Sequence, residues 1–213
     1  DYYASRGLGD VYKRQVWEHT VNAVSECIDK ENVKLAMFFH DIAKPECFTV
    51  DFSGRGHFKG HAQKSALKAE AVMKRMRFPK SVILNVKAII YHHSDELNTE
   101  FELKKILNQI GVRNAFDLID AQRADSLSKQ DFCRERLKKS DMQEQSLRDI
   151  LKRGECFSIK MLDINGYDLI ELGFKGIEIK NALSLLLDNV MRGIVENSRD
   201  SLMHRAKSIK NGL

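Results

Sequence analysis

Histidine and aspartate are the residues of this sequence whose types and spacing point to chemistry. Six of the seven histidines lie within the first 93 residues, and His40 is followed directly by Asp41 at the end of a very apolar segment. A solvated charge is not expected there, because burying an unpaired ionised group is costly. His19 precedes this pair, and Asp125 follows in a later segment of helical periodicity. Imidazole and carboxylate together suit Mn, Fe, Co, Ni or Zn, and Mg can join through carboxylates, so the pattern predicts a divalent metal site.

Helices must position these side chains. Apolar residues recur at helical spacing in the segments that carry the histidines and in most of those that follow. Pro45 and Pro79 end two of the helices, and glycines among aromatic residues predict an exposed loop at 46–59. We expect an all-α fold, since helix bundles build metal sites from inward side chains on facing helices. The expected helices cover residues 16–30, 35–42, 61–77, 81–93, 101–110, 114–127 and 132–151.

The sequence predicts a leader, a main helical domain and a smaller helical tail. Residues 1–15 contain the string SRGLGDVYKRQ, which resembles translated library-adapter sequence. We therefore expect a non-native leader, with the natural protein extending upstream of it. Residues 16–151 form the main domain, and their highly charged last helix is predicted to be a solvated connector. The pattern of charged and apolar residues changes after Gly154, which predicts a helical tail over residues 152–213.

Composition excludes several classes of protein. The chain has 213 residues, 43% hydrophobic and 31% charged, which excludes wholesale disorder. No apolar run approaches the ~18–20 residues of a membrane helix, so no membrane association is expected. Four cysteines without a CxxC pair predict buried or free thiols in a reducing compartment, the cytoplasm. The net charge of +5 permits a polyanionic partner such as RNA and equally fits a plain basic surface.

The order of these residues carries a family resemblance. His19, then His40-Asp41, then Asp125 resembles the H…HD…D pattern of the HD-domain phosphohydrolase superfamily, whose members are helical metal-dependent enzymes acting on phosphate esters. The segment FFHDIAKPECFTVDFSGRGHFKGHAQKSA is similar to the HD domain of bacterial CCA-adding tRNA nucleotidyltransferases and their poly(A)-polymerase-like relatives. The tail segment DINGYDLIELGFKGIEIKNALSLLLDNVMRG is similar to the C-terminal motif of the same family.

This resemblance implies a ligand set for two metal ions, of Mn, Ni, Co, Fe or Mg. It also implies an HD-domain helical bundle followed by a smaller helical C-terminal subdomain. His92 is expected in the second ion's set, but His93, one position round the helix, is an equal candidate. One ion would be held by His19, His40, Asp41 and Asp125, and the second by His61 and His92, with Asp41 bridging.

Four further residues are expected near the substrate. Lys44 follows the metal pair by one turn and is a candidate phosphate clamp, although a solvated helix end explains it equally well. Arg55, His57 and Lys59 lie on the glycine-rich loop and are expected to bind substrate. Asp41 and Lys44 are the expected catalytic residues.

The resemblance implies a metal-dependent phosphohydrolase acting on a phosphomonoester or a 2′,3′-cyclic phosphodiester, carried by a nucleotide or an RNA end. The nucleotidyltransferase head of that family, with its glycine-rich loop and paired aspartates, has no match here, so we expect no nucleotide addition by this chain. A non-catalytic module that grips tRNA is the alternative. A cyclic-dinucleotide phosphodiesterase ranks last, because no Gly-Tyr-Pro element follows His92-His93.

Overall fold

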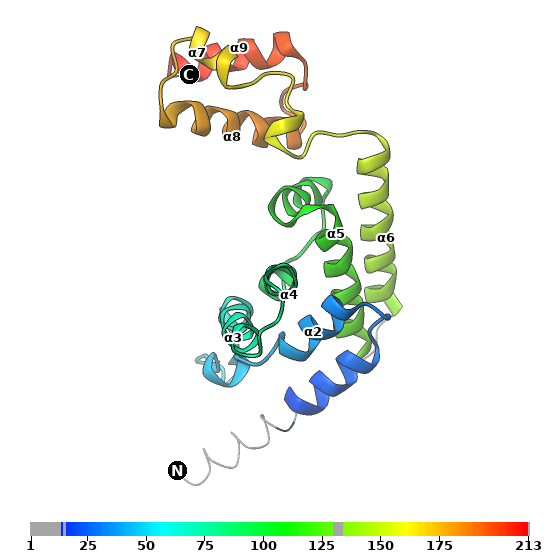
Figure 1. The fold of residues 1–213 in the computed structure, drawn as a ribbon. Helices are drawn as coiled ribbons and strands as arrows, with labels where there is room; N and C mark the ends of the chain where they lie inside the picture. Colours follow the sequence, from blue (N-terminus) through cyan, green and yellow to red (C-terminus); the bar gives the residue numbers. More distant parts are fainter. Residues whose placement is uncertain (1–13, 15, 130–133, 213) are drawn as a thin grey trace. The chain divides into compact units, whose positions relative to one another are not determined.

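The computed structural model describes residue 14, residues 16–129 and residues 134–212, and it is mostly helical, which confirms the all-α prediction (Figure 1). The predicted leader lies almost wholly outside the described residues. The first helix occupies residues 16–25. The others are α2 (Glu31–Phe39), α3 (His61–Arg75), α4 (Lys80–His92), α5 (Glu100–Leu127), α6 (Arg134–Lys152), α7 (Gly166–Glu171), α8 (Ile177–Met191) and α9 (Arg199–Lys210), with 3-10 turns η1 (Lys44–Glu46) and η2 (Ile159–Met161).

Two segments differ from the sequence expectation. The predicted loop contains a short antiparallel hairpin, β1 (Thr49–Val50) and β2 (Gly56–His57). Its turn is closed by Asp51, whose Oδ1 accepts hydrogen bonds from the backbone N–H groups of Ser53 and Arg55. The helices expected at 101–110 and 114–127 follow one another without a loop as α5, and Gly111 breaks the helical path between them with φ 79°. Only glycine adopts this left-handed conformation without strain.

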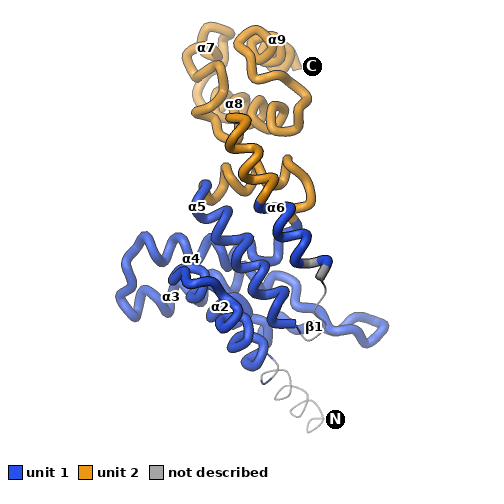
Figure 2. The backbone as a smooth tube through the Cα atoms, turned by 90° about the vertical axis from the view of Figure 1, so that its right-hand side faces the viewer, with its two compact units in different colours: residues 1–96, 112–144 blue, residues 97–111, 145–213 orange. Residues whose placement is uncertain are grey.

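The described chain forms two compact units (Figure 2). Unit 1 comprises residues 1–96 and 112–144, and unit 2 comprises residues 97–111 and 145–213. Unit 2 therefore takes in more than the tail expected at 152–213, because α5 and α6 each contribute residues to both units.

Unit 1 is organised around the packing of α2, α3 and α4 against one another. Their inward faces bury apolar side chains completely, and the C-terminal half of α5 adds its own. This packing determines which helix ends meet and therefore which polar side chains are brought together. The largest fully buried side chains are Met37, Met73, Ile89, Ile90, Leu118 and Ile119.

Unit 2 has its own apolar core, formed by the helices of the tail. Leu169, Leu186 and Leu202 are fully buried in it. α7 begins with a capping box: the Asn165 side chain accepts a hydrogen bond from the backbone N–H of Tyr167, and the Asp168 carboxylate accepts one from the backbone N–H of Asn165. Across the described residues, no helix is long and apolar enough to cross a membrane.

Candidate metal centre

Helix ends bring the predicted ligands together in unit 1. His40 is the C-cap of α2, His93 is the C-cap of α4, and Asp125 lies in the last turn of α5. The C-terminal end of a helix carries partial negative charge and favours a cation. His61 begins α3, and His19 comes from the first helix. Three helix C-termini thus supply ligand side chains to one place.

The first group of ligand atoms surrounds His40. Its Nε2 lies 3.2 Å from His19 Nε2, 3.2 Å from Asp41 Oδ2 and 3.5 Å from Asp125 Oδ1. His19 Nε2 lies 2.9 Å from Asp125 Oδ1 and 3.6 Å from Asp41 Oδ2. Ligands at ~2.0–2.2 Å from an ion lie roughly 3–3.5 Å from one another. His19, His40 and Asp41 therefore have the spacing of a single coordination shell, and Asp125 Oδ1 lies within 3.5 Å of both imidazole nitrogens of that group.

A second group adjoins the first through the same carboxylate. Asp41 Oδ1 lies 3.4 Å from His61 Nε2 and 3.8 Å from His93 Nε2, and the two imidazole nitrogens are 3.1 Å apart. Asp41 thus presents one oxygen to each group. This is the arrangement expected of a carboxylate that bridges two ions.

In all four histidines of the two groups, Nδ1 makes a hydrogen bond outside the cluster and Nε2 faces the other ligand atoms. The Nδ1–H groups of His40, His61 and His93 donate to the backbone carbonyls of residues 37, 58 and 90, at 2.6, 2.9 and 2.7 Å. His19 Nδ1–H donates to the Ser128 hydroxyl, whose own hydrogen goes to the carbonyl of residue 125. In the neutral form of each ring, Nε2 is therefore the nitrogen with the free lone pair, and these nitrogens face one another. Such outer hydrogen bonds are typical of metal-ligating histidines, because they set tautomer and ring orientation.

The buried carboxylate of Asp41 gives an independent test of fit. Its side chain is fully buried, and its Oδ1 accepts no hydrogen bond from any described residue. A buried carboxylate oxygen without a hydrogen-bond donor is costly, and an adjacent cation removes that cost. The Nε2 atoms of His61 and His93, which face one another at 3.1 Å while both Nδ1–H groups are bound to backbone carbonyls, carry the same implication. The residues present therefore fit one or two divalent cations.

Electrostatics keep the carboxylates ionised. Burial alone would raise the pKa of Asp41, but His40 and Lys44 outweigh it and hold the pKa well below its usual range. The pKa of Asp125 is lowered in the same way by His19, His40 and Lys129.

The pKa values of the imidazoles shift in opposite directions in the two groups. Burial alone would lower the pKa of His40, but hydrogen bonds with Asp125 and Asp41 outweigh it and raise the pKa to about 9. Burial and the charge of His40 lower the pKa of His93 to about 4. The pKa of His61 is also lowered, chiefly by burial. Neutral imidazole, the form that binds metal, is thus favoured in the second group.

The structure places His93, not His92, in the second group. His92 turns away and its Nδ1 lies 2.7 Å from Asp95 Oδ2. The expectation that named His92 is corrected accordingly, and the equal alternative His93 takes its place. The physical reason is that neighbours on a helix point about 100° apart. The packing of α4 on α2 and α3 turns the second of the two rings inward.

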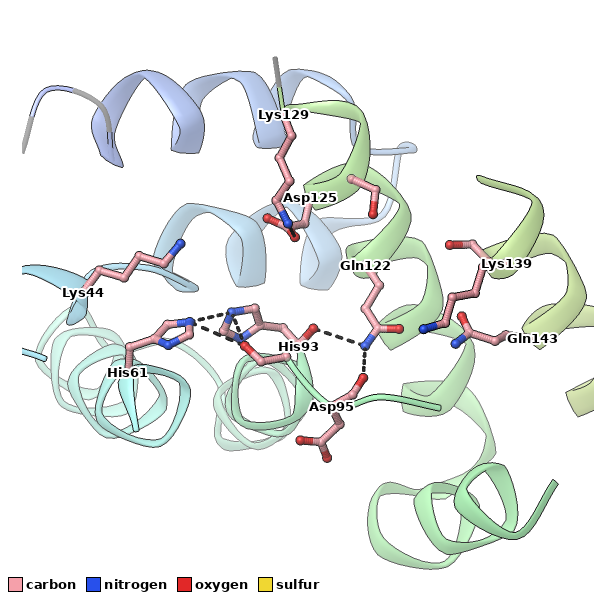
Figure 3. A pocket seen from close by; sticks show the side chains of 12 residues that line it. Lys44, His61, His93, Asp95, Gln122, Asp125, Lys129, Lys139 and Gln143 are labelled. Atoms are coloured by element: carbon pink, nitrogen blue, oxygen red, sulfur yellow. Dashed lines mark hydrogen bonds and ion pairs between the residues drawn. The ribbon is translucent and has the colours of Figure 1, made fainter. Parts of the chain in front are cut away.

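Lysines stand at the edge of the ligand groups. Lys44 Nζ lies 2.5 Å from Asp41 Oδ2, and Lys129 Nζ lies 2.6 Å from Asp125 Oδ2. Both line one cavity with His61 and His93 (Figure 3). Lys44 thus lies where sequence reasoning expected it. Lys129 was missed, although its i,i+4 spacing from Asp125 is a recognisable signal.

Three of the expected substrate-binding residues, Arg55, His57 and Lys59, lie on the hairpin or directly after it. His57 and Lys59 line a second cavity together with Lys44 and His61. His57 Nε2 is 2.7 Å from Asp51 Oδ2. Arg55 is exposed and is not among the residues that line either cavity.

Comparison with known proteins agrees with this geometry. Residues 11–151 match the HD domain family, so this chain belongs to that family. The match begins within the 15 residues predicted as a leader. The chain is also 30% identical over 204 residues to the CC-adding tRNA nucleotidyltransferase of Thermus thermophilus. That alignment covers 91% of this chain and 45% of the relative, so the chain spans less than half the relative's length. These matches confirm the predicted resemblance. No solved structure matches the chain.

Proposed function

We propose that unit 1 is a metal-dependent phosphohydrolase acting on a phosphomonoester or a 2′,3′-cyclic phosphodiester of a nucleotide or an RNA end. The observation that carries this proposal is the buried Asp41 carboxylate, which offers one oxygen to each of two histidine groups. Nothing described donates a hydrogen bond to its Oδ1. A purely structural Asp–His pair would need neither the facing lone pairs nor this unsatisfied oxygen.

The proposed ligands follow from the distances. His19, His40, Asp41 and Asp125 hold one ion, and Asp41, His61 and His93 hold the second. When bound, such ions polarise a phosphoryl oxygen, lower the pKa of water and neutralise developing charge. Mn, Ni, Co, Fe and Mg are all compatible with this mixture of imidazole and carboxylate.

The protein's own cations orient the phosphate. Lys44, a proposed catalytic residue, holds its ammonium group beside the bridging carboxylate, at the edge of the cavity. A lysine there binds a phosphate oxygen as a point charge. Lys129 has the equivalent place beside Asp125. Arg55, His57 and Lys59 remain proposed substrate contacts, on the hairpin or directly after it, where they would close over a bound phosphate.

The similarity to a tRNA nucleotidyltransferase supports a second function for this chain. It covers 91% of the chain, unit 2 included, and the sequence has a net charge of +5. On this alternative the chain is a non-catalytic part of a CCA-adding type of enzyme that grips tRNA and binds metal without turnover.

One experiment separates these functions. The chain is freed of metal with EDTA and reloaded with Mn, Ni, Co or Mg. Metal content and hydrolysis of 2′,3′-cyclic AMP and 3′-AMP are then measured. Asp41→Asn preserves shape and removes the bridging charge. Asp29→Asn, at an exposed aspartate paired with Lys34, is the matched control.

The proposal expects metal-dependent turnover in the parent and in Asp29→Asn, and its loss in Asp41→Asn. Metal that binds without turnover on either substrate would favour the tRNA-gripping alternative. Failure of the parent to bind any of the four metals would refute the site assignment itself.

A further inference from the structure

A cavity of about 390 Å³ extends from the metal centre to α6. This volume lies in the ~300–1,000 Å³ range of small-molecule sites and exceeds what a single phosphate needs. Its walls come from the ends of α4 and α5 and from α6 (Figure 3). The α6 wall consists of Lys139, Ser140 and Gln143. Sequence reasoning treated this helix as a solvated connector.

The α6 wall is held in place by Arg123. This residue of α5 reaches across to α6, where its guanidinium bonds Asp141 and Glu144, each at 3.0 Å. It also bonds Asp120 on its own helix at 2.9 Å. A fork of donors shared among three carboxylates fixes relative position better than a single surface pair.

Polar side chains line the part of the cavity between the metal centre and α6. Gln122 donates from its side-chain amide to the carbonyls of His93 at 3.1 Å and Asp95 at 2.9 Å. Both partners are acceptors, so the orientation of the amide is determined. Its side-chain oxygen accepts no hydrogen bond from the described residues. On the α6 side, Gln143 and Ser140 are buried polar side chains that line the same space.

The charged side chains that line the cavity differ in whether they form ion pairs. Lys44 and Lys129 pair with the ligand carboxylates Asp41 and Asp125, and Asp95 faces His92. Lys139 is exposed and, within the described part of the chain, pairs with no carboxylate. The cavity therefore has a free cation on α6, the Lys139 ammonium group, and polar side chains line the space between it and the metal centre.

We infer that this cavity takes a nucleotide with phosphates on both sides of its ribose, as at an RNA 3′ end, and that Lys139 determines this specificity. The inference rests on the proposed function, since the reacting phosphate lies at the metal centre. Gln122 offers its side-chain oxygen as a hydrogen-bond acceptor to the nucleoside between the two phosphates. Lys139 makes a charge-assisted hydrogen bond to the second phosphate.

The test uses neighbouring lysines as a matched pair. Lys139→Met removes the cation of the cavity, whereas Lys138→Met removes an equal, exposed charge one position away that does not line the cavity. Kinetics with adenosine 3′,5′-bisphosphate and 3′-AMP are measured in the Mn-loaded full chain. Binding of adenosine 3′,5′-bisphosphate to the EDTA-treated chain is measured by calorimetry, which requires neither turnover nor metal.

Lys139→Met is expected to raise KM for the bisphosphate about fivefold and to weaken its binding to the EDTA-treated chain about fivefold, the upper end for an ion pair at an exposed site. KM for 3′-AMP and the kcat values stay within about twofold. Lys138→Met matches the parent. Equal effects of the two variants, or equal effects on both substrates, would overturn the inference. If the chain hydrolyses neither substrate, the proposed function fails, and the calorimetric comparison still decides the site.

Discussion

The hydroxyl of Ser128 controls one metal ligand without touching the ion, and its removal tests the geometry of the centre. Ser128 Oγ donates to the carbonyl of Asp125 at 2.8 Å and therefore accepts from His19 Nδ1–H at 3.0 Å. That bond keeps His19 in the tautomer whose Nε2 lone pair faces Asp125 and His40. Ser128→Ala leaves every ligand in the chain and removes only this constraint.

The expected loss of metal affinity in Ser128→Ala depends on how exposed the His19 ring is. Loss of an outer hydrogen bond to a metal ligand typically weakens binding ~10–100-fold. The His19 side chain is 17% exposed, so water can take over part of the role of the hydroxyl. We therefore expect the lower end, a loss of about tenfold, which corresponds to about 1.4 kcal/mol.

Calorimetric titration of the EDTA-treated chain with Mn²⁺ measures this loss directly. Ser25→Ala is the control, because it also removes a hydroxyl that bonds backbone carbonyls, at an exposed position of the first helix. Thermal unfolding of the metal-free proteins shows whether Ser128→Ala changes the fold. Parent-like affinity in a folded Ser128→Ala protein would refute the argument that His19 is a ligand held by this serine.

Two further predictions concern the second ligand group and the packing of unit 1. His93→Ala should lower the bound Mn²⁺, measured by elemental analysis after dialysis, from two ions per chain to one, whereas His92→Ala should retain both. The reverse result would restore His92 as the ligand. Hydrogen bonds from Lys74 and Lys87 lower the pKa of Glu70 to about 2, so its carboxylate stabilises the fold above the unfolded pKa of 4.5. Glu70→Gln should lower the urea midpoint at pH 7, and the difference from the parent should vanish as pH falls from 4.5 to 2; a difference independent of pH would contradict this.

Sequence order was enough to identify most of the candidate centre. His19, the His40-Asp41 pair, His61 and Asp125 were predicted as ligands, and the structure brings their side chains together. This was possible because the order of His19, His40-Asp41 and Asp125 resembles the HD-domain pattern, and that resemblance implies the ligand set. The all-α fold followed from apolar periodicity.

Adjacent residues at a helix end could not be resolved in this way. His92 and His93 differ by about 100° around α4, and both stand at its C-terminal boundary, where the apolar pattern stops. Which ring points inward depends on how α4 is rotated against α2 and α3. That rotation is decided by side-chain packing between segments distant in sequence, which periodicity within one helix does not contain.

The sequence by itself determined the helical fold, the residue types of the metal centre and the family of the chain. Only the tertiary structure showed that His93 lies in the second group and that Ser128 holds His19. It also showed that α6, expected as a solvated connector, forms one wall of the cavity. The physical reason lies in the range of the interactions. Apolar periodicity and short motifs are local, whereas the contact between His19 and Ser128 joins residues 109 positions apart.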